Sequence, residues 1–331
     1  MKIDKITVLG DGGWGTTLSM LLAEKGFGLT LWTVSSEYAG YLNRTRRNVK
    51  FLPDFTIPRR IKITSDLTEA LCGAKVVVLA IPSQYLRGVL DRIEPEDLRD
   101  KFIVSAVKGI ENNTLMRMSE VIRDVWGNFR VSVLSGPTIA VEVARKIPTA
   151  AVIASGDAKT AEILQNVFFT DRFRVYKNND LIGVELGGSI KNIIAIACGI
   201  CDGLKFGTNT TAALLARGLA EMSRLGVAMG ARAHTFYGIS GLGDLATTCA
   251  SKYSRNRGVG EKVGRGKKLK DIISRMNMVA EGVPTVKSAY ELSKKYKVDM
   301  PITKEVYAVL YKNKSPLRAV DDLMKRRMKE E

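Results

Sequence analysis

The sequence predicts an α/β protein in two parts: a mostly parallel sheet with helices on both faces, followed by a domain made of helices. In the first half, short apolar runs alternate with stretches of helical spacing, which is typical of βαβ units. A glycine-rich turn follows the first of these runs, and the strand-like runs fade near residue 180. A chain of 331 residues is long enough for two domains with sizeable cores. We expect the first to span residues 1–185 and the second 186–331.

The individual elements follow from these patterns. The strand-like runs are residues 6–10, 29–33, 76–81, 102–107, 131–136 and 150–155. Helical spacing of apolar residues lies between several of them, for example at 16–26 and 114–126. Beyond residue 180 the chain has the pattern of helices separated by glycine-rich turns.

Composition indicates an ordinary globular protein, with 45% hydrophobic and 26% charged residues. The N-terminus passes through one short apolar run into the glycine-rich turn, so we expect neither a signal peptide nor stable membrane insertion. The four cysteines (Cys72, Cys198, Cys201 and Cys249) are too few and too scattered for a disulfide scaffold. We therefore expect a reduced, cytoplasmic setting.

The net charge of +17 has two interpretations, nucleic-acid binding or the handling of phosphorylated small molecules. Much of the positive charge falls in short runs at 44–47, 59–60, 264–270 and 325–329. None of these runs is interleaved with aromatic residues, and no nucleic-acid-binding motif is present. We expect no nucleic-acid partner. A nucleotide-sensing, DNA-binding regulator is the alternative from a different class, and sequence-specific retention of DNA would favour it.

The strongest local motif is VLGDGGWGTTLSMLL at residues 8–22, in which Gly10, Gly12 and Gly15 fit the pattern G-x-G-x-x-G. The motif follows a predicted strand and precedes a predicted helix, which is the context that gives the pattern meaning. The first glycine permits a tight turn, the second admits a pyrophosphate, and the third lets helix and strand pack closely. The motif predicts a dinucleotide site.

The second strand normally distinguishes NAD from NADP, through an acidic residue or an arginine about 20 residues past the loop. Here that strand ends LWTVSSE, with neither residue at its tip. Glu37 comes late and, after Ser35 and Ser36, resembles a residue in the first turn of a helix. Arg44, Arg46 and Arg47 are candidates to reach a 2′-phosphate, and surface residues are the equal alternative. The missing carboxylate favours NADP or dual use, and the cofactor is predicted as NADP or NAD.

A nicotinamide enzyme that reduces a carbonyl needs a proton donor, usually histidine. The single histidine, His234, has only Arg232 as a charged neighbour, so we interpret it as structural or exposed. Cys198 and Cys201 form a C-x-x-C inside an apolar helical run without a second ligand pair, so we interpret them as core residues and predict no metal site. Lysine is then the leading candidate. Lys191 is the one charge between residues 186 and 201, either a snorkelling surface lysine or a catalytic one.

Two further stretches suit ligand binding. Lys108 follows the strand at 102–107, at the carboxyl edge where open α/β sheets bind ligands, although a lysine may simply end a strand there. LSGPT at 134–138 ends the next strand in a Gly-Pro turn. Downstream, a glycine-flanked segment offers Asp244, Thr248, Ser254, Arg255 and Asn256, and its hydroxyl, guanidinium and amide donors suit a phosphate. The alternative for Arg255 and Arg257 is a solvated basic turn.

The order of these motifs resembles one family. G-x-G-x-W-G-T at 10–16, KG at 108–109, SGPT at 135–138, the stretch 183–210, GLGDL at 241–245 and SRNR at 254–257 occur as they do in bacterial NAD(P)-dependent glycerol-3-phosphate dehydrogenases. The resemblance extends from residue 4 to about 325, and includes EMSRLG at 221–226, VAEGVPTVK at 279–287 and MPITKEVY at 300–307.

The resemblance implies a Rossmann-like domain, a helical C-terminal domain of the 6-phosphogluconate-dehydrogenase-like kind, and an active site between them. It implies that Lys191 is the proton donor to dihydroxyacetone phosphate, reduced for phospholipid synthesis in the cytoplasm, in a possible homodimer. The implied substrate-binding residues are Lys108, Gly136, Thr138, Lys191, Asn192, Asp244, Thr248, Ser254, Arg255 and Asn256. The implied cofactor-binding residues are Gly10, Gly12, Gly13, Trp14, Gly15, Lys108, Ala140, Arg255, Val279 and Glu281.

The sequence departs from this family at two positions. Gly13 stands where members often carry serine or alanine, which we expect to be harmless. Val34 stands where many carry arginine or histidine, which counts against NADP. By the family's pattern Lys108 lies near Lys191; we expect this like charge and burial to lower the pKa of Lys191 and Asp244 to raise it.

Related two-domain enzymes are the close alternatives: ketopantoate, 6-phosphogluconate and UDP-sugar dehydrogenases. None of the four cysteines has the setting of the nucleophile that a UDP-sugar enzyme needs. Assays on the candidate substrates separate these possibilities.

Overall fold

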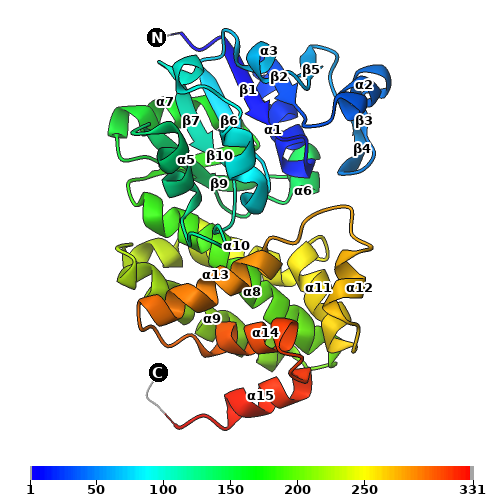
Figure 1. The fold of residues 1–331 in the computed structure, drawn as a ribbon, viewed down its shortest axis with the longest axis vertical. Helices are drawn as coiled ribbons and strands as arrows, with labels where there is room; N and C mark the ends of the chain where they lie inside the picture. The colour runs from blue at the N-terminus through cyan, green and yellow to red at the C-terminus, as the bar shows by residue number, and fades with distance from the viewer. Residues whose placement is uncertain (1, 329–331) are drawn as a thin grey trace. The chain divides into compact units, whose positions relative to one another are not determined.

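A computed structural model describes residues 2–328 of the chain, which form two compact units (Figure 1). The first unit contains residues up to Lys108 and Met116–Glu185, and the second contains Gly109–Leu115 and Leu186–Glu331. The chain therefore changes unit between Glu185 and Leu186. The segment 109–115, which the sequence places in the first domain, packs with the second unit instead. Ser288 on a later helix explains this, because its hydroxyl donates to the Ile110 carbonyl (3.2 Å) and to Asn112 Oδ1 (2.7 Å).

The first unit is built on one large sheet with strand order β10-β9-β8-β7-β6-β1-β2-β5, beside a small β3–β4 ribbon. All six predicted strands form. The bounds are β1 Lys5–Leu9, β2 Gly28–Trp32, β3 Arg47–Asn48, β4 Leu52–Thr56, β5 Ile61–Thr64, β6 Val76–Leu79, β7 Phe102–Ser105, β8 Val131–Ser135, β9 Thr149–Ala154 and β10 Phe173–Asn178.

The sheet is parallel from β5 across to β8, as predicted for βαβ units. β9 pairs with β8 in the antiparallel direction and β10 pairs with β9 in parallel, so these two strands run against the rest. β1 lies between β2 and β6, with later strands added on either side. The strand order therefore reverses at β1, and open α/β sheets bind ligands at the carboxyl ends of the strands beside such a reversal.

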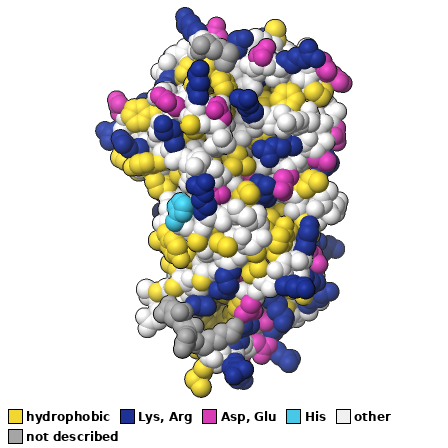
Figure 2. Space-filling model, turned by 90° about the vertical axis from the view of Figure 1, so that its left-hand side faces the viewer, with side chains coloured by type: hydrophobic (Ala, Val, Ile, Leu, Met, Phe, Trp, Pro, Cys, Tyr) yellow, Lys and Arg dark blue, Asp and Glu magenta, His cyan; other side chains and the backbone are white. Residues whose placement is uncertain are grey.

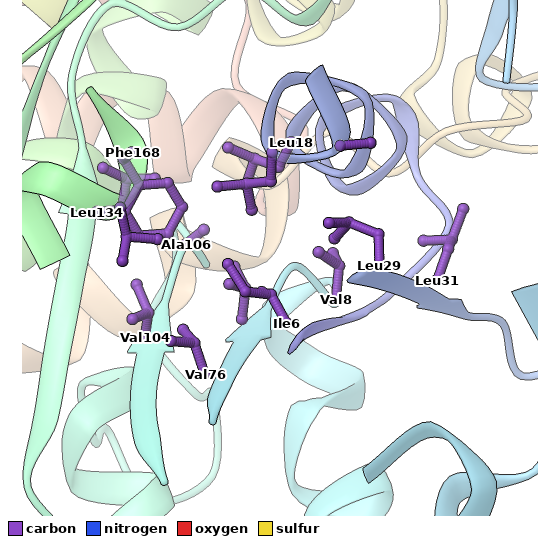
Figure 3. Close-up of a cluster of buried hydrophobic side chains, with 14 of the residues drawn as sticks. Ile6, Val8, Leu18, Leu29, Leu31, Val76, Val104, Ala106, Leu134 and Phe168 are labelled. Atoms are coloured by element: carbon purple, nitrogen blue, oxygen red, sulfur yellow. The ribbon is translucent and has the colours of Figure 1, made fainter. Parts of the chain in front are cut away.

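Helices cover both faces of this sheet, as the sequence predicts. Their bounds are α1 Gly13–Glu24, α2 Ser36–Thr45, α3 Leu67–Leu71, α4 Leu86–Leu90, α5 Met118–Trp126, α6 Ala140–Ala144 and α7 Ala158–Phe168, with 3₁₀ turns at Ser83–Tyr85 and Pro95–Leu98. Because successive strand residues point to opposite faces, the apolar strands supply two cores. Ile6 and Val8 of β1 pack with Leu18 of α1 on one face, together with Phe168 of α7 (Figure 3). Leu9 and Val77 pack on α3, α4 and α5 on the other face.

The second unit is helical. Its elements are α8 Leu181–Gly203, which begins in the first unit, α9 Thr208–Ala228, α10 Asp244–Ala250, α11 Arg255–Gly264, α12 Leu269–Ile273, α13 Gly282–Lys295, α14 Pro301–Tyr311 and α15 Pro316–Met324. A 3₁₀ turn at Ala233–Tyr237 and a π turn at Ile239–Gly243 precede α10. Among residues 2–328, α8 alone is long and apolar enough to cross a membrane by length and composition, but 89% of its apolar window is buried. It is the core helix of this unit.

Glycines bring α11 against α8 at backbone distance. A Cβ on Gly199 of α8 would lie 2.0 Å from the Arg257 carbonyl oxygen, and one on Gly260 of α11 would lie 2.0 Å from that of Ile196. One turn further on, Gly203 and Gly264 make the same kind of approach. Since no other residue lacks a Cβ, this pairing of Gly-x-x-x-Gly segments fixes how the two helices pack.

The remaining sequence interpretations concern single residues and charge. Cys198 and Cys201 are buried on α8, as expected for core residues, and His234 is exposed, as expected. On the face shown in Figure 2, Lys and Arg side chains are dispersed and mixed with Asp and Glu. Within residues 2–328, no group of three or more His, Cys, Asp or Glu side chains has the arrangement of a metal site.

Candidate active site

The glycine loop lies at the carboxyl end of β1, where the strand order reverses. Gly10 has φ +115°, and a Cβ there would lie 2.5 Å from the Ala80 carbonyl oxygen at the end of β6. A Cβ on Gly15 would lie 1.9 Å from the Gly10 oxygen. Both positions therefore require glycine, the first for the turn and the second for the start of α1 against it.

The start of α1 fits a pyrophosphate. Gly12 is the N-cap and no side chain caps this end of the helix. A Cβ on Gly12 would meet nothing within 4 Å, so the space beside the loop is open. Uncapped amides at the positive end of a helix, next to open space, bind phosphates well. The residues present therefore fit the pyrophosphate of NAD or NADP.

Three other predicted cofactor residues, Gly13, Trp14 and Ala140, lie at the same loop. The Thr17 hydroxyl of α1 donates to the Ala140 carbonyl (3.2 Å), which brings the start of α6 to the loop. Gly13 proves more constrained than the sequence implies, because a Cβ there would lie 2.7 Å from the Phe51 carbonyl oxygen. Trp14 follows it, and its buried indole N–H has no hydrogen-bond partner among the described residues.

The end of β2 carries no charged side chain that would bind a phosphate on the ribose. Val34 is 66% exposed, and Ser35 caps α2 by accepting from the Tyr38 amide (3.1 Å). Glu37 lies in the first turn of α2, as expected. The Arg46 guanidinium donates to the Ile61 carbonyl (2.8 Å), and Ile61 pairs with Leu29 at the amino end of the strands. The hypothesis that Arg46 reaches a 2′-phosphate at the carboxyl edge is therefore wrong.

The residues predicted after β7 and β8 come together. Lys108 Nζ donates to the Gly136 carbonyl (2.7 Å) and contacts Thr138 Oγ1 (3.4 Å). Gly136 has φ +140°, which turns the chain sharply after β8. Because β7 and β8 are parallel neighbours, their carboxyl ends meet, and Lys108 stands at this edge of the sheet.

In the second unit, Lys191 is buried and hydrogen-bonded to two of its predicted neighbours. Its ammonium donates to Asp244 Oδ1 (2.5 Å) and to Thr248 Oγ1 (2.6 Å). The Thr248 hydroxyl in turn donates to the Asp244 carbonyl (2.6 Å) one turn earlier on α10. The side chains of Lys191 and Asp244 are 6% and 2% exposed. Lys191 is therefore not a snorkelling surface lysine but a buried cation with a fixed orientation.

A chain of amides connects the next predicted residues. Asn256 Nδ2 donates to Asn192 Oδ1 (2.8 Å), and Asn256 Oδ1 accepts from the Gly282 amide (2.9 Å) at the start of α13. The exposed Arg255 donates through Nη1 to the Val279 carbonyl (2.8 Å), which places it beside Val279. Ser254 caps α11 by accepting from the Arg257 amide, and Arg257 pairs with Asp202 of α8 (2.6 Å). Of the two arginines, Arg257 is thus structural.

The sequence reasoning missed two residues beside the glycine loop. Asn48 Nδ2 donates to the Asp11 carbonyl (2.7 Å) and to Thr16 Oγ1 (2.8 Å), bracing the loop from β3. Asp11 lies beside the end of β2, because the amide of its neighbour Gly10 donates to the Trp32 carbonyl (3.0 Å). The position of Asp11 inside the glycine motif could have indicated a role at the loop. Nothing in the sequence indicates that Asn48 contacts the loop.

These features define a two-unit, nicotinamide-dependent dehydrogenase with a buried lysine in its helical part. Comparison with known proteins identifies its family. Residues 5–161 match the sequence profile of the N-terminus of NAD-dependent glycerol-3-phosphate dehydrogenase, and residues 180–321 match that of its C-terminus. The chain belongs to the NAD-dependent glycerol-3-phosphate dehydrogenase family and is an oxidoreductase that uses NAD or NADP.

Individual relatives agree with this assignment. The chain is 50% identical over 329 residues to glycerol-3-phosphate dehydrogenase [NAD(P)+] of Syntrophotalea carbinolica, covering 98% of this chain and 99% of that one. It is 51% identical over 330 residues to the enzyme of that name from Chlorobium phaeobacteroides, covering 99% of each. The crystal structure of glycerol-3-phosphate dehydrogenase from Coxiella burnetii superposes with a TM-score of 0.94 at 37% identity, covering 98% of this chain and 99% of that one.

Proposed function

We propose that this enzyme reduces dihydroxyacetone phosphate to sn-glycerol 3-phosphate, with Lys191 as the proton donor, and that the product feeds phospholipid synthesis. The buried contact of the Lys191 ammonium with Asp244 and Thr248 carries this proposal. A carbonyl reduction develops negative charge on oxygen, and a positioned ammonium both stabilises that charge and supplies the proton.

Reduction of the carbonyl needs one hydride and one proton. The hydride to the carbonyl carbon would come from a reduced nicotinamide bound at the glycine loop. Lys191 gives one proton to the carbonyl oxygen, which becomes the hydroxyl of the product. In the reverse direction the neutral amine takes that proton back. Asp244 and Thr248 hold the nitrogen in place in both directions, because each is a fixed acceptor for it.

Arg255 and Asn256 are proposed to bind the phosphate of the substrate. Both residues lie in the first turn of α11, a ten-residue helix whose N-terminus is its positive end. The Arg255 guanidinium is planar and offers several donors besides the one given to Val279, which suits a phosphate. Asn256 is held by Asn192, so the phosphate position is tied to the helix that carries Lys191.

In the first unit, the glycine loop, Trp14 and Ala140 are proposed to hold the cofactor. Lys108, Gly136 and Thr138 are proposed to bind substrate at the carboxyl edge of the sheet. Val279 and Glu281 are proposed to contact the cofactor from the segment tied down by Arg255. These roles are supported by the local geometry and by the family's pattern.

Initial rates of dihydroxyacetone phosphate reduction with NADH and with NADPH test the proposal. We expect turnover with at least one cofactor and little with ketopantoate or 6-phosphogluconate. If protein that binds either cofactor does not turn over dihydroxyacetone phosphate, the proposed substrate is contradicted but the dinucleotide site is not.

We further propose that the enzyme is a cytoplasmic homodimer. A largely apolar groove of about 1000 Å³ lies among α9, α14 and α15, lined among others by Leu214, Val306 and Leu323. Exposed apolar surface of this size commonly marks an interface, and most soluble oligomers pair identical chains. Sedimentation of wild type and Leu214→Glu tests this proposal; a monomeric mass for the wild type would contradict it.

A further inference from the structure

We propose that Asp11 selects between the two nicotinamide cofactors, supplying beside the end of β2 the carboxylate that β2 itself lacks and so disfavouring the 2′-phosphate of NADP. The inference rests on the proposed cofactor position at the glycine loop. It addresses a gap that the sequence leaves open, since the LWTVSSE segment carries no acidic residue at the strand tip.

The backbone of Asp11 is held firmly beside the end of β2. The Gly10 amide donates to the Trp32 carbonyl (3.0 Å), which ties the loop to the last residue of that strand. The Asp11 carbonyl accepts from Asn48 Nδ2 (2.7 Å) and from Thr16 Oγ1 (3.1 Å). Three contacts from different elements therefore fix the position of the Asp11 backbone, from which the side chain projects.

Asp11 follows Gly10, which is bonded to Trp32 at the end of β2, so its carboxyl projects beside that end. The neighbouring Thr33 side chain acts on this carboxyl by opposing the rise that burial causes in the pKa of Asp11. In dinucleotide-binding sheets the end of this strand is where the adenosine ribose lies, and a carboxylate there accepts hydrogen bonds from the ribose hydroxyls. A 2′-phosphate at the same place would bring like charges together. Asp11 thus performs from the loop the task that an acidic residue performs from the strand.

Two cations of this region, Arg46 and Lys50, have contacts of their own. Val34 occupies the tip itself and Arg46 is turned to the amino end of the strands. The charge of Lys50 acts on Asp11, and its ammonium lies over the Tyr38 ring at 4.3 Å from the centroid. Burial raises the pKa of Asp11, while the Thr33 side chain and the charge of Lys50 oppose that rise.

Isothermal titration of the enzyme with adenosine 5′-monophosphate and with adenosine 2′,5′-bisphosphate at pH 8 tests the inference without requiring turnover. We expect wild type to bind the monophosphate more tightly. Asp11→Asn should improve the ratio of bisphosphate to monophosphate affinity about tenfold, as expected for removal of one close like charge. Asp11→Ser serves as a second variant in case the amide perturbs the loop, and the kcat/KM ratio for NADPH over NADH should shift in the same direction.

Two control variants each remove one negative charge at another position in the first unit. Glu162→Gln lies on the exposed side of α7 and should leave the ratio unchanged. Glu37→Gln lies in the first turn of α2 and should change it less than Asp11→Asn. An unchanged ratio in both Asp11 variants, or a larger effect from Glu37→Gln, would overturn the inference while leaving the proposed function intact. Failure of wild type to bind either nucleotide would overturn the cofactor site as well.

Discussion

The Lys191 ammonium and the Asp244 carboxylate lie 2.5 Å apart, both buried, with the Thr248 hydroxyl 2.6 Å from the same nitrogen. Burial of an unpaired cation is costly, so this contact explains how a lysine is retained in an otherwise apolar helix. Because Asp244 and Thr248 stand one turn apart on α10, a single short helix supplies both acceptors.

Thr248→Val should lower kcat without abolishing folding. The change removes one of the two acceptors that orient Lys191, and a hydrogen bond to a charged group contributes on the order of 2 kcal/mol, so we expect a loss of about tenfold or more. Steady-state kinetics with dihydroxyacetone phosphate measures it. Thr248→Ser keeps the hydroxyl and should restore most of kcat; an unchanged kcat in Thr248→Val, or an equal loss in Thr248→Ser, would contradict the role given to the hydroxyl.

Gly260→Ala should destabilise the protein and weaken substrate binding together. The new Cβ would lie 2.0 Å from the Ile196 carbonyl oxygen, so α11 must move away from α8. Overpacking of this kind costs about 1–3 kcal/mol, and α11 carries Arg255 and Asn256. We expect a lower free energy of unfolding in urea and a raised KM for dihydroxyacetone phosphate. Gly258→Ala is the matched control, since a Cβ there meets nothing within 4 Å; the same loss in that variant would contradict the explanation.

Glu221 should make stability depend on pH. It is buried on α9 and accepts from the Ile302 and Thr303 amides at the start of α14 (2.5 and 3.1 Å). Burial raises its pKa to about 7, although these hydrogen bonds oppose the rise. The folded pKa lies above the unfolded one, so this group's contribution is greatest at low pH and is lost between about pH 4.5 and 7.

The expected loss is on the order of 3 kcal/mol across that window. Urea unfolding at pH 5 and pH 8 measures it. In Glu221→Gln, which does not titrate, the difference between the two pH values should shrink by this amount. A difference as large as that of wild type would mean that other groups cause the pH dependence.

Much of the fold follows from local patterns in the sequence. Six strands and the glycine loop are predictable because each depends on a short run of apolar or glycine residues. The antiparallel direction of β9 is not, since its sequence, TAAVIA, suits either direction and neighbouring strands decide it. The attachment of 109–115 to the second unit depends on Ser288, which is far away in sequence.

For the same reason, some residues of the candidate site could be predicted from the sequence and others could not. Lys191 could be singled out because a lone charge in an apolar helix is conspicuous. Its contacts with Asp244 and Thr248, like that of Asn192 with Asn256, join residues more than 50 positions apart and become visible only in the fold. The sequence left open whether Arg46 reaches a 2′-phosphate, because it does not show that the guanidinium donates to the Ile61 carbonyl.

The turnover of Lys191→Ala is the most direct measurement of the proposed mechanism. We predict a loss in kcat of about 10²–10⁴-fold, with the Kd for the cofactor nearly unchanged, because no described cofactor contact depends on this side chain. Circular dichroism on the same protein establishes that it is folded. A folded Lys191→Ala enzyme that binds cofactor and retains near-normal kcat would contradict the assignment of Lys191 as the proton donor.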